Sequence, residues 1–486
     1  MRLIFEKSSP GRRGVSLPEL DVPFSAVLDE KYCRKEPACL PEVSELDAVR
    51  HFSNLSRMNF SVDTNFYPLG SCTMKYNPKF TEAAAAMDEF SSLHPLLPQL
   101  LGGGMLVQGA LEVLYNTEHL LCEITGMDAF TTQPLAGAHG ELTGVMLVSA
   151  YHKDKGRKRK YVIVPDSSHG TNPASASIAG YDVVVVPTGK DGFMDMERYK
   201  QALSEDVAAV MLTCPDTLGF FNPGIKEITD LAHKAGALMY YDGANLNAVL
   251  GKCRPADMGF DIMHINLHKT FATPHGGGGP GSGPVGVRGE LADFLPISRV
   301  VRRDDGTFAL DYSRRKTIGY IAPFYGNFGV ILKAYAYMLA LGKDGLIQVS
   351  ENAVLSANYC LARLKEHYLP AYAKERCMHE CVLSASAQLE KGVHALDIAK
   401  YLIDKGFHPP TIYFPLIVKE AMMVEPTETE SKETLDTFIE AMIEASKLAG
   451  ADPDALHSAP VSMPVKRLDE TAAARQPDLR WQAKSK

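Results

Sequence analysis

Short apolar runs alternate with segments of helical periodicity through the middle of the chain. The apolar runs predict six strands, at residues 161–165, 183–186, 207–213, 237–241, 262–266 and 285–287. Apolar residues at helical spacing predict helices over 107–124, 139–151 and 225–235, the first of which stops at Gly126. Nearly continuous apolar strands with helices between them are typical of a mostly parallel sheet covered by helices, so an α/β fold is expected.

The same pattern divides the chain into three parts. Residues 1–60, rich in proline and mixed charge, predict an extended N-terminal arm that wraps a neighbouring subunit or domain. Residues 61–330 make up the predicted large α/β domain. Residues 331–486 predict a small α+β domain, with strands near 378–383 and 411–416 and helices near 394–405 and 431–447.

Composition narrows the class of protein. No apolar stretch approaches the ~18 residues of a membrane span, and the N-terminus has no apolar segment before charge returns, so a soluble, cytoplasmic protein is expected. The formal net charge of −8 argues against nucleic-acid binding. The nine cysteines form no Cys-x-x-Cys pair and are odd in number, which favours free thiols over a disulfide framework or a metal site.

One lysine follows a predicted buried strand and precedes an unusually glycine-rich loop. Lys269 lies just after residues 262–266, at the carboxyl end of the strand, where open α/β sheets bind their ligands. Four consecutive glycines at 276–279 let backbone approach a ligand closely. Lys269 is therefore either a covalent anchor for an aldehyde cofactor or an ordinary surface lysine.

Two side chains at other strand ends favour the cofactor interpretation. Asp242 ends the strand 237–241, and a carboxylate there can keep a pyridine nitrogen protonated, which makes the ring an electron sink. Its alternative role is to cap the next helix. His169 follows the strand 161–165 and could stack on the face of a cofactor ring, or it could be a turn residue with no such role. One helix and one strand fit between Asp242 and Lys269, so these two residues are expected to end adjacent strands.

Phosphate binding is expected at the turn Ala136-Gly137-Ala138. Backbone N–H groups at the start of the following helix carry partial positive charge and bind phosphate without a side chain, although a plain helix-entry turn looks the same. His268, beside Lys269, could donate to the phosphate. Thr217 stands at another predicted strand end and could contact the cofactor or be an ordinary turn residue.

The motif Asp242-x-Ala-x together with His268-Lys269 resembles fold type I pyridoxal-phosphate enzymes. A closer resemblance, over nearly the whole chain, is to the glycine decarboxylase P-protein family of the glycine cleavage system, and within it to subunit 2 of the two-subunit form. Three segments carry it: Phe66-Tyr67-Pro68-Leu69-Gly70-Ser71-Cys72-Thr73-Met74-Lys75-Tyr76-Asn77-Pro78, residues 266–281, and Met422-Met423-Val424-Glu425-Pro426-Thr427-Glu428-Thr429-Glu430.

The resemblance implies an aminotransferase-like fold with pyridoxal 5'-phosphate bound to Lys269 as a Schiff base. Asp242 and His169 become catalytic residues, and Ala244 and Asn245 join the cofactor contacts. The implied reaction is decarboxylation of glycine with transfer of the aminomethyl group to the lipoyl arm of the H-protein. The implied partners are therefore glycine, the lipoylated H-protein and subunit 1, in an α2β2 heterotetramer, with no nucleic acid and no membrane.

Some points depart from the family or stay open. Many relatives have a serine at the position of Ala136, so a hydroxyl contact to phosphate is in doubt. The glycine run is expected to form a wall of the channel for the lipoyl arm, with His275 as a candidate proton donor. Cys72 could be a redox switch or inertly buried, and Glu425 and Glu428 could contact substrate or cap the helix that follows.

Three rival functions remain. A cysteine-desulfurase-like enzyme needs a cysteine on a mobile loop near the site, and residues 276–330 contain none. An amino-acid decarboxylase of the same fold would share the aspartate, histidine and lysine. A nucleotide-binding scaffold subunit would need its glycine loop to lead into a helix, whereas this one leads to the predicted strand at 285–287.

Overall fold

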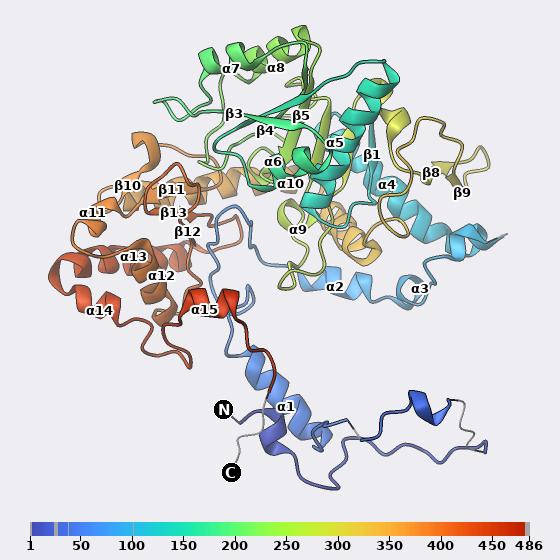
Figure 1. Cartoon of the computed structure of the whole chain (residues 1–486), viewed down its shortest axis with the longest axis vertical. Coiled ribbons are helices and arrows are strands. Elements are labelled where there is room, and N and C mark those ends of the chain that lie inside the picture. The colour runs from blue at the N-terminus through green and yellow to red at the C-terminus, as the bar shows by residue number, and fades with distance from the viewer. Residues whose placement is uncertain (1, 24–27, 37, 101, 482–486) are drawn as a thin grey trace. The chain divides into compact units, whose positions relative to one another are not determined.

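The computed structural model describes residues 2–23, 28–36, 38–100 and 102–481 (Figure 1). Parts of the predicted arm (1, 24–27, 37) and the end of the predicted small domain (482–486) lie outside the described residues. The chain forms two compact units, Met1–Ser61 and Val62–Lys486. In the first, the described residues form two short 3-10 helices, Ile4–Lys7 and Glu30–Tyr32, and one α-helix, α1 (Glu45–Ser56), whose first turn is capped by Ser44.

The second unit is built on a seven-stranded sheet. Its strands lie in the order β1-β7-β6-β5-β4-β2-β3, and β7 is antiparallel to both of its neighbours while the other pairs are parallel. The strands are β1 (Ala129–Thr131), β2 (Tyr161–Pro165), β3 (Asp182–Val186), β4 (Val207–Thr213), β5 (Leu238–Gly243), β6 (Ile262–Ile265) and β7 (Val285–Val287). All six predicted strands are present, and the prediction of a mostly parallel sheet is confirmed. Only β1, three residues long, gave no sequence signal.

Both faces of this sheet are buried. Along β2, Ile163 belongs to one hydrophobic cluster, whereas Val162 and Val164 belong to another, and β4 divides its residues in the same way. Alternate side chains of a strand point to opposite faces, so both clusters must be covered by helices. This double burial explains why the strands are apolar at nearly every position rather than at every second one.

The predicted helices are present with shifted ends. The helices of the large sheet are α4 (Gln108–Thr125), α5 (Gly137–Asp154), α6 (Thr171–Ile178), α7 (Met196–Ala202), α8 (Ile225–Lys234) and α9 (Leu267–Thr270). Gly126 ends α4 as predicted, in the left-handed conformation with φ 74°, and its N–H donates to Cys122 O. The helix α5 begins at Gly137 rather than 139, because its first turn packs through small residues that carry no apolar periodicity.

The C-terminal part has a second, four-stranded antiparallel sheet in the order β10-β11-β13-β12. Its strands are β10 (Leu369–Pro370), β11 (Cys381–Ser384), β12 (Thr411–Ile412) and β13 (Ala421–Val424). The predicted strand at 411–416 extends over only two residues, and the central strand β13 was not predicted. Two helices expected here are present as α12 (Ala395–Asp404) and α13 (Lys432–Ala451).

The remaining elements connect these layers. The longest is α10 (Phe328–Leu364), which is interrupted at Gly342, where φ is 58° and ψ is −171°. A separate hairpin pairs β8 (Arg299–Arg302) with β9 (Phe308–Asp311). The other helices are short: α2 (Lys79–Ala85), α3 (Asp88–Ser91), α11 (Ser386–Leu389), α14 (Pro453–His457) and α15 (Glu470–Arg475). Within the described ranges, no helix combines the length and apolarity needed to cross a membrane.

Candidate active site

Asp242 and Lys269 meet at the carboxyl ends of adjacent parallel strands. Asp242 lies in β5 opposite His264 of β6, and Lys269 follows β6 in the short helix α9. Both residues line a cavity of about 260 Å³. The cavity is lined by Ser71, Cys72, Gly137, Ala138, Glu141, His169, Thr171, Thr213, Thr217, Asp242, Ala244, Asn245, Asn266, His268, Lys269 and His275.

Nearly all of the residues predicted for the site gather at this cavity. The predicted residues that line it are Gly137, Ala138, His169, Thr217, Asp242, Ala244, Asn245, His268 and Lys269. Ala136 does not, because it precedes α5 as the N-cap residue and its carbonyl accepts from Gly140 N. Ser71, Glu141, Thr171 and Thr213 also line the cavity but were not predicted, because nothing in the linear sequence indicates that their side chains face Lys269.

Asp242 is buried and surrounded by hydrogen-bond donors. Its carboxylate accepts from Ala244 N (3.0 Å), Asn172 Nδ2 (3.2 Å) and Thr213 Oγ1 (3.3 Å), and it lies 3.3 Å from His264 Nε2. Burial alone would raise the pKa of Asp242, but His264 and Lys269, together with the hydrogen bonds from Ala244 and Asn172, outweigh burial and lower it. Asp242 is therefore a carboxylate at neutral pH. Of the hydrogen bonds to Asp242, only the one from Ala244 N resembles the helix capping that was considered as its alternative role.

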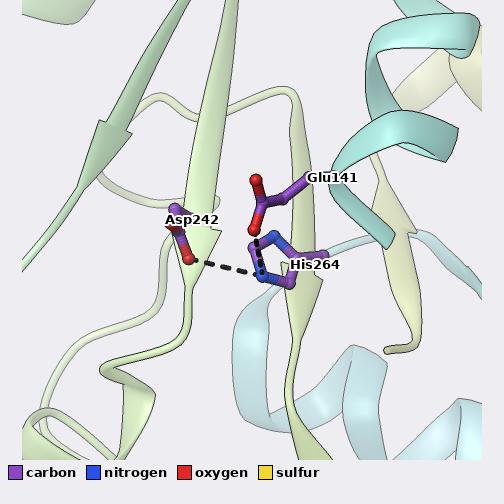
Figure 2. A group of neighbouring side chains, drawn as sticks. All are labelled: Glu141, Asp242 and His264. Carbon is purple, nitrogen blue, oxygen red and sulfur yellow. Dashed lines mark ion pairs between the residues drawn. The ribbon is translucent and has the colours of Figure 1, made fainter. Parts of the chain in front are cut away.

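Glu141, on α5, joins Asp242 and His264 in one buried group (Figure 2). Glu141 Oε1 lies 4.0 Å from His264 Nε2, and the other side of the His264 ring is 2.8 Å from the Tyr240 hydroxyl. Burial and the nearby charge of Asp242 raise the pKa of Glu141 to about 8. Two adjacent carboxyl groups thus differ in charge at neutral pH, because Asp242 accepts three hydrogen bonds and Glu141 accepts one.

His169 stands at the mouth of the cavity on the loop after β2. Its Nδ1 is 2.8 Å from Thr171 Oγ1, which in turn donates to Glu141 Oε1 at 2.8 Å. Burial, followed by the positive charge of Lys269, lowers the pKa of His169, so its ring is neutral near pH 7. A neutral ring that is held by Thr171 can stack against a flat ligand without repelling Lys269.

The start of α5 faces the other side of the cavity. A Cβ atom on Gly137 would lie 2.4 Å from Asn266 Oδ1, so any larger residue there would displace Asn266 or the start of the helix. His268 Nδ1 accepts from Ser282 N at 3.3 Å, and burial, with His275 and Lys269 nearby, lowers the pKa of His268 to about 3. The neutral imidazole therefore carries its proton on Nε2, where it is a donor.

A strained turn in the segment 66–78 lines the cavity through Ser71 and Cys72. Ser71 and Thr73 have φ values of 63° and 51°, which non-glycine residues rarely adopt. Glu425 accepts from the N–H groups of Cys72 and Thr73, at 3.1 and 2.8 Å, and Glu380 accepts from Ser71 N at 2.7 Å. Glu425 thus supports the turn and does not line the cavity.

Cys72 stands in this turn with its thiol protonated. Burial raises the pKa of Cys72 to about 11, although Lys269 acts in the opposite direction. A thiol in this state is a weak nucleophile near neutral pH.

The glycine run joins the linings of two cavities. Its first residues Gly276, Gly277 and Gly278 have φ values of 57°, 67° and 101°, which favour glycine. His275, just before them, lines the cavity around Lys269, whereas Gly279 and Pro280 line a second cavity of about 400 Å³. Phe90, Leu93, Leu111, Leu114 and Phe328 give that second cavity a largely apolar lining.

The fold and the strand-end site together place this protein in the fold type I class of pyridoxal-phosphate enzymes. A solved structure, the inhibitor-bound crystal structure of glycine decarboxylase (P-protein) of the glycine cleavage system, superposes with a TM-score of 0.70. It covers 86% of this chain and 93% of its own at 22% identity, and so it bears on the fold alone.

Sequence comparison gives the family. Residues 104–306 match the family model described as glycine cleavage system P-protein, and residues 349–452 match the one described as glycine dehydrogenase, C-terminal domain. Proteins described as probable glycine dehydrogenase (decarboxylating) subunit 2 from Caldanaerobacter subterraneus subsp. tengcongensis and Bacillus licheniformis are each 56% identical, over 99% of this chain and 98% of theirs. One from Listeria monocytogenes serotype 4a is 55% identical over the same shares. The chain belongs to this subunit 2 family of glycine cleavage P-proteins, which confirms the resemblance noted in the sequence.

Proposed function

We propose that this chain is the cofactor-carrying subunit of a glycine decarboxylase. It binds pyridoxal 5'-phosphate through Lys269, decarboxylates glycine, and passes the aminomethyl group to the lipoyl arm of the H-protein. The observation that carries the proposal is the convergence of Lys269 with an ionised Asp242 at adjacent strand ends, in a chain that is 56% identical over nearly its full length to glycine dehydrogenase subunits. The three rival functions, a cysteine desulfurase, another amino-acid decarboxylase of this fold and a nucleotide-binding scaffold, are not favoured. The family match covers nearly the whole chain.

The residues present fit this cofactor. A buried carboxylate of lowered pKa suits a protonated pyridine nitrogen, and Glu141, being neutral, adds no second charge beside it. The glycine at 137 lets Asn266 pack against the first turn of α5, where backbone N–H groups have no partners within the helix and are free to bind a phosphate group. When bound, the cofactor supplies a conjugated ring that accepts the electron pair released by loss of CO2.

Each side chain then has a defined task. Asp242 holds the ring proton, and Ala244 and Asn245 line the same end of the cavity. His169 would cover one face of the cofactor ring. Gly137 and Ala138 offer backbone donors to the phosphate, with His268 Nε2 as an additional donor and Ala136 setting the helix entry. Thr217 is held by a hydrogen bond to the carbonyl of Ser167, which fixes its side chain at the edge of the site.

The cavity is also suited to losing a carboxylate. Among its described lining residues, the only side chain that is ordinarily cationic at neutral pH is Lys269, and arginine is absent. A strong ion pair to the carboxylate in the bound substrate would have to be given up as CO2 leaves, which would raise the barrier to decarboxylation. A site with a weak counter-charge avoids that cost.

The partners follow from the family and from the second cavity. The relatives are named subunit 2, so we propose a complex with subunit 1, in an α2β2 heterotetramer, with the arm of residues 1–60 contacting a neighbouring subunit. The apolar cavity beside Gly279 and Pro280 is a route by which a lipoyl arm could pass the glycine run toward Lys269. We also propose that residues 61–330 form the large domain and residues 331–486 the small domain. The proposed location is the cytoplasm.

Isotope exchange tests this function. With glycine, subunit 1 and lipoylated H-protein present, the holoenzyme should exchange labelled bicarbonate into the carboxyl group of glycine. Lys269→Ala should abolish both the exchange and the visible absorbance of covalently bound cofactor. Equally fast exchange without subunit 1 and H-protein would contradict the two-subunit assignment, and an unchanged absorbance in Lys269→Ala would contradict the anchor.

A further inference from the structure

Two segments far apart in the sequence, 66–78 and 421–430, lie side by side. Leu69 forms an antiparallel bridge with Val424, and Gly70 N donates to Met423 O at 3.2 Å. The approach is close, because a Cβ atom on Gly70 would lie 2.2 Å from Met423 Cγ. Further along, Tyr76 N donates to Thr429 Oγ1 at 3.2 Å. The first segment is therefore fixed along its length to the C-terminal sheet.

The same segment also holds the backbone that follows Lys269. Lys75 Nζ donates to the carbonyl of Thr270 at 2.8 Å, and Asn77 Nδ2 donates to the carbonyl of Ala272 at 3.0 Å. Ala272 has φ 55°, a conformation that costs free energy for any residue except glycine. Such a backbone persists only where the surroundings hold it, and these two donors meet it from outside the cavity.

Lys75 is unusually well fixed for a lysine. Its side chain is 1% exposed, and its ammonium group has three acceptors: Thr270 O, Asn247 Oδ1 at 2.9 Å and Glu428 Oε1 at 2.6 Å. The three N–H bonds of an ammonium group are thus all used. Burial acts to lower the pKa of Lys75, but Glu428 and Tyr337 outweigh burial and raise it. Lys75 stays charged, and it does not line the cavity around Lys269.

We propose that Lys75, charged and oriented by Glu428, is a positioning residue that holds α9 so that Lys269 is already aimed into the cavity before the cofactor arrives. Asn77 assists by fixing Ala272. The inference rests on the proposed role of Lys269 as cofactor anchor. Holding the segment in advance lowers the entropy that would otherwise be lost when the cofactor binds. The segments 66–78 and 421–430 would then act by holding α9 in place, rather than by contacting substrate or capping a helix.

The test uses cofactor-free full-length protein. Peptide-resolved hydrogen exchange would follow the amides of Lys269, Phe271 and Ala272, which donate within residues 266–272. A second readout is the rate at which added pyridoxal 5'-phosphate is captured at Lys269, trapped by borohydride and measured by peptide mass. The variants are Lys75→Met, Asn77→Ala and the double variant Lys75→Met/Glu428→Gln. The matched control is Lys79→Met, since Lys79 belongs to the same region but pairs with Asp63 at the surface.

We expect Lys75→Met to speed exchange at 267–273 and to slow capture, each about tenfold, as for loss of a hydrogen bond from a charged donor. Lys75→Met leaves Glu428 buried without its cation and could unfold the protein. The double variant removes both charges, so it should fold and still show the faster exchange. Asn77→Ala should give a smaller effect at Ala272, and Lys79→Met none.

The proposal is overturned if the folded double variant exchanges 267–273 at the wild-type rate. It is equally overturned if exchange rises uniformly across the strands of the large sheet, because that would indicate general destabilisation. Failure of the wild-type protein to capture any pyridoxal phosphate would instead contradict the proposed function, and the exchange measurement would still decide whether Lys75 orders α9.

Discussion

Asp242 and His264 occupy facing positions on adjacent parallel strands, with Asp242 Oδ1 3.3 Å from His264 Nε2. Burial lowers the pKa of His264, so the ring is neutral. The ring lies between two groups, since its Nδ1 is 2.8 Å from the Tyr240 hydroxyl and its Nε2 faces Asp242 without forming a hydrogen bond to it. His264 therefore acts on Asp242 electrostatically, and the hydrogen bonds to the buried carboxylate come from Ala244, Asn172 and Thr213.

Asp242→Asn should keep part of the bound cofactor and lose most turnover. An amide of similar shape preserves the cavity but cannot hold a proton on the pyridine nitrogen. Loss of such a preorganised charge is expected to lower kcat by about two orders of magnitude or more. Cofactor absorbance and the bicarbonate exchange rate should be measured on the same sample, and full activity in this variant would overturn the role given to Asp242.

His264→Phe should shift the acid side of the pH profile. Asp242 has a lowered pKa partly because of His264, and removing that ring lets burial raise the pKa of the carboxyl group. The carboxylate is then protonated at higher pH as the solution is acidified, so the acid limb of kcat/KM moves upward. Tyr240→Phe is the matched control, since it alters only the far side of the ring and should shift the limb less. A limb that stays in place in His264→Phe would count against this coupling.

Glu141→Gln should flatten the dependence of stability on pH in the cofactor-free protein. The folded-state pKa of Glu141 is raised to about 8, so the folded state binds this proton more tightly than the unfolded state. Its contribution is full below the unfolded pKa of ~4.3 and is lost as pH rises through about 8. Wild-type protein should therefore lose a few kcal/mol from this group across that window. Urea unfolding of both proteins at several pH values measures the difference, and parallel curves would refute the assignment.

Gly137→Ala should weaken cofactor binding. The added methyl group would lie 2.4 Å from Asn266 Oδ1, so either Asn266 or the start of α5 must move. The dissociation constant for pyridoxal 5'-phosphate is expected to rise about tenfold or more, since overpacking typically costs ~1–3 kcal/mol. Gly104→Ala is the control, because a Cβ atom there meets nothing within 4 Å. Equal dissociation constants for the cofactor in the two variants would show that cofactor binding does not depend on glycine at position 137.

The part of the site that lies at strand ends could be read from the sequence. Asp242, His169 and Lys269 each follow an apolar run, and the carboxyl ends of parallel strands meet at one edge of the sheet. Glu141 could not be found in this way. It lies inside a helix rich in small residues, and their pattern does not indicate which face of the helix is turned toward the site. Glu425 and Glu428 could be seen as unusual, but capping and binding remained equally open for them.

The sequence by itself determined the alternation of strands and helices, the position of Lys269 and the family, because local periodicity and linear motifs carry that information. Only the tertiary structure decided that Glu425 supports the turn at 71–73 and that Glu428 fixes Lys75 behind Lys269. These partners are more than 350 residues apart in the chain, as the separations of 352 between Thr73 and Glu425 and 353 between Lys75 and Glu428 record. A contact across such a distance depends on how the segment 66–78 packs against the C-terminal sheet, and no local pattern of residues specifies that packing.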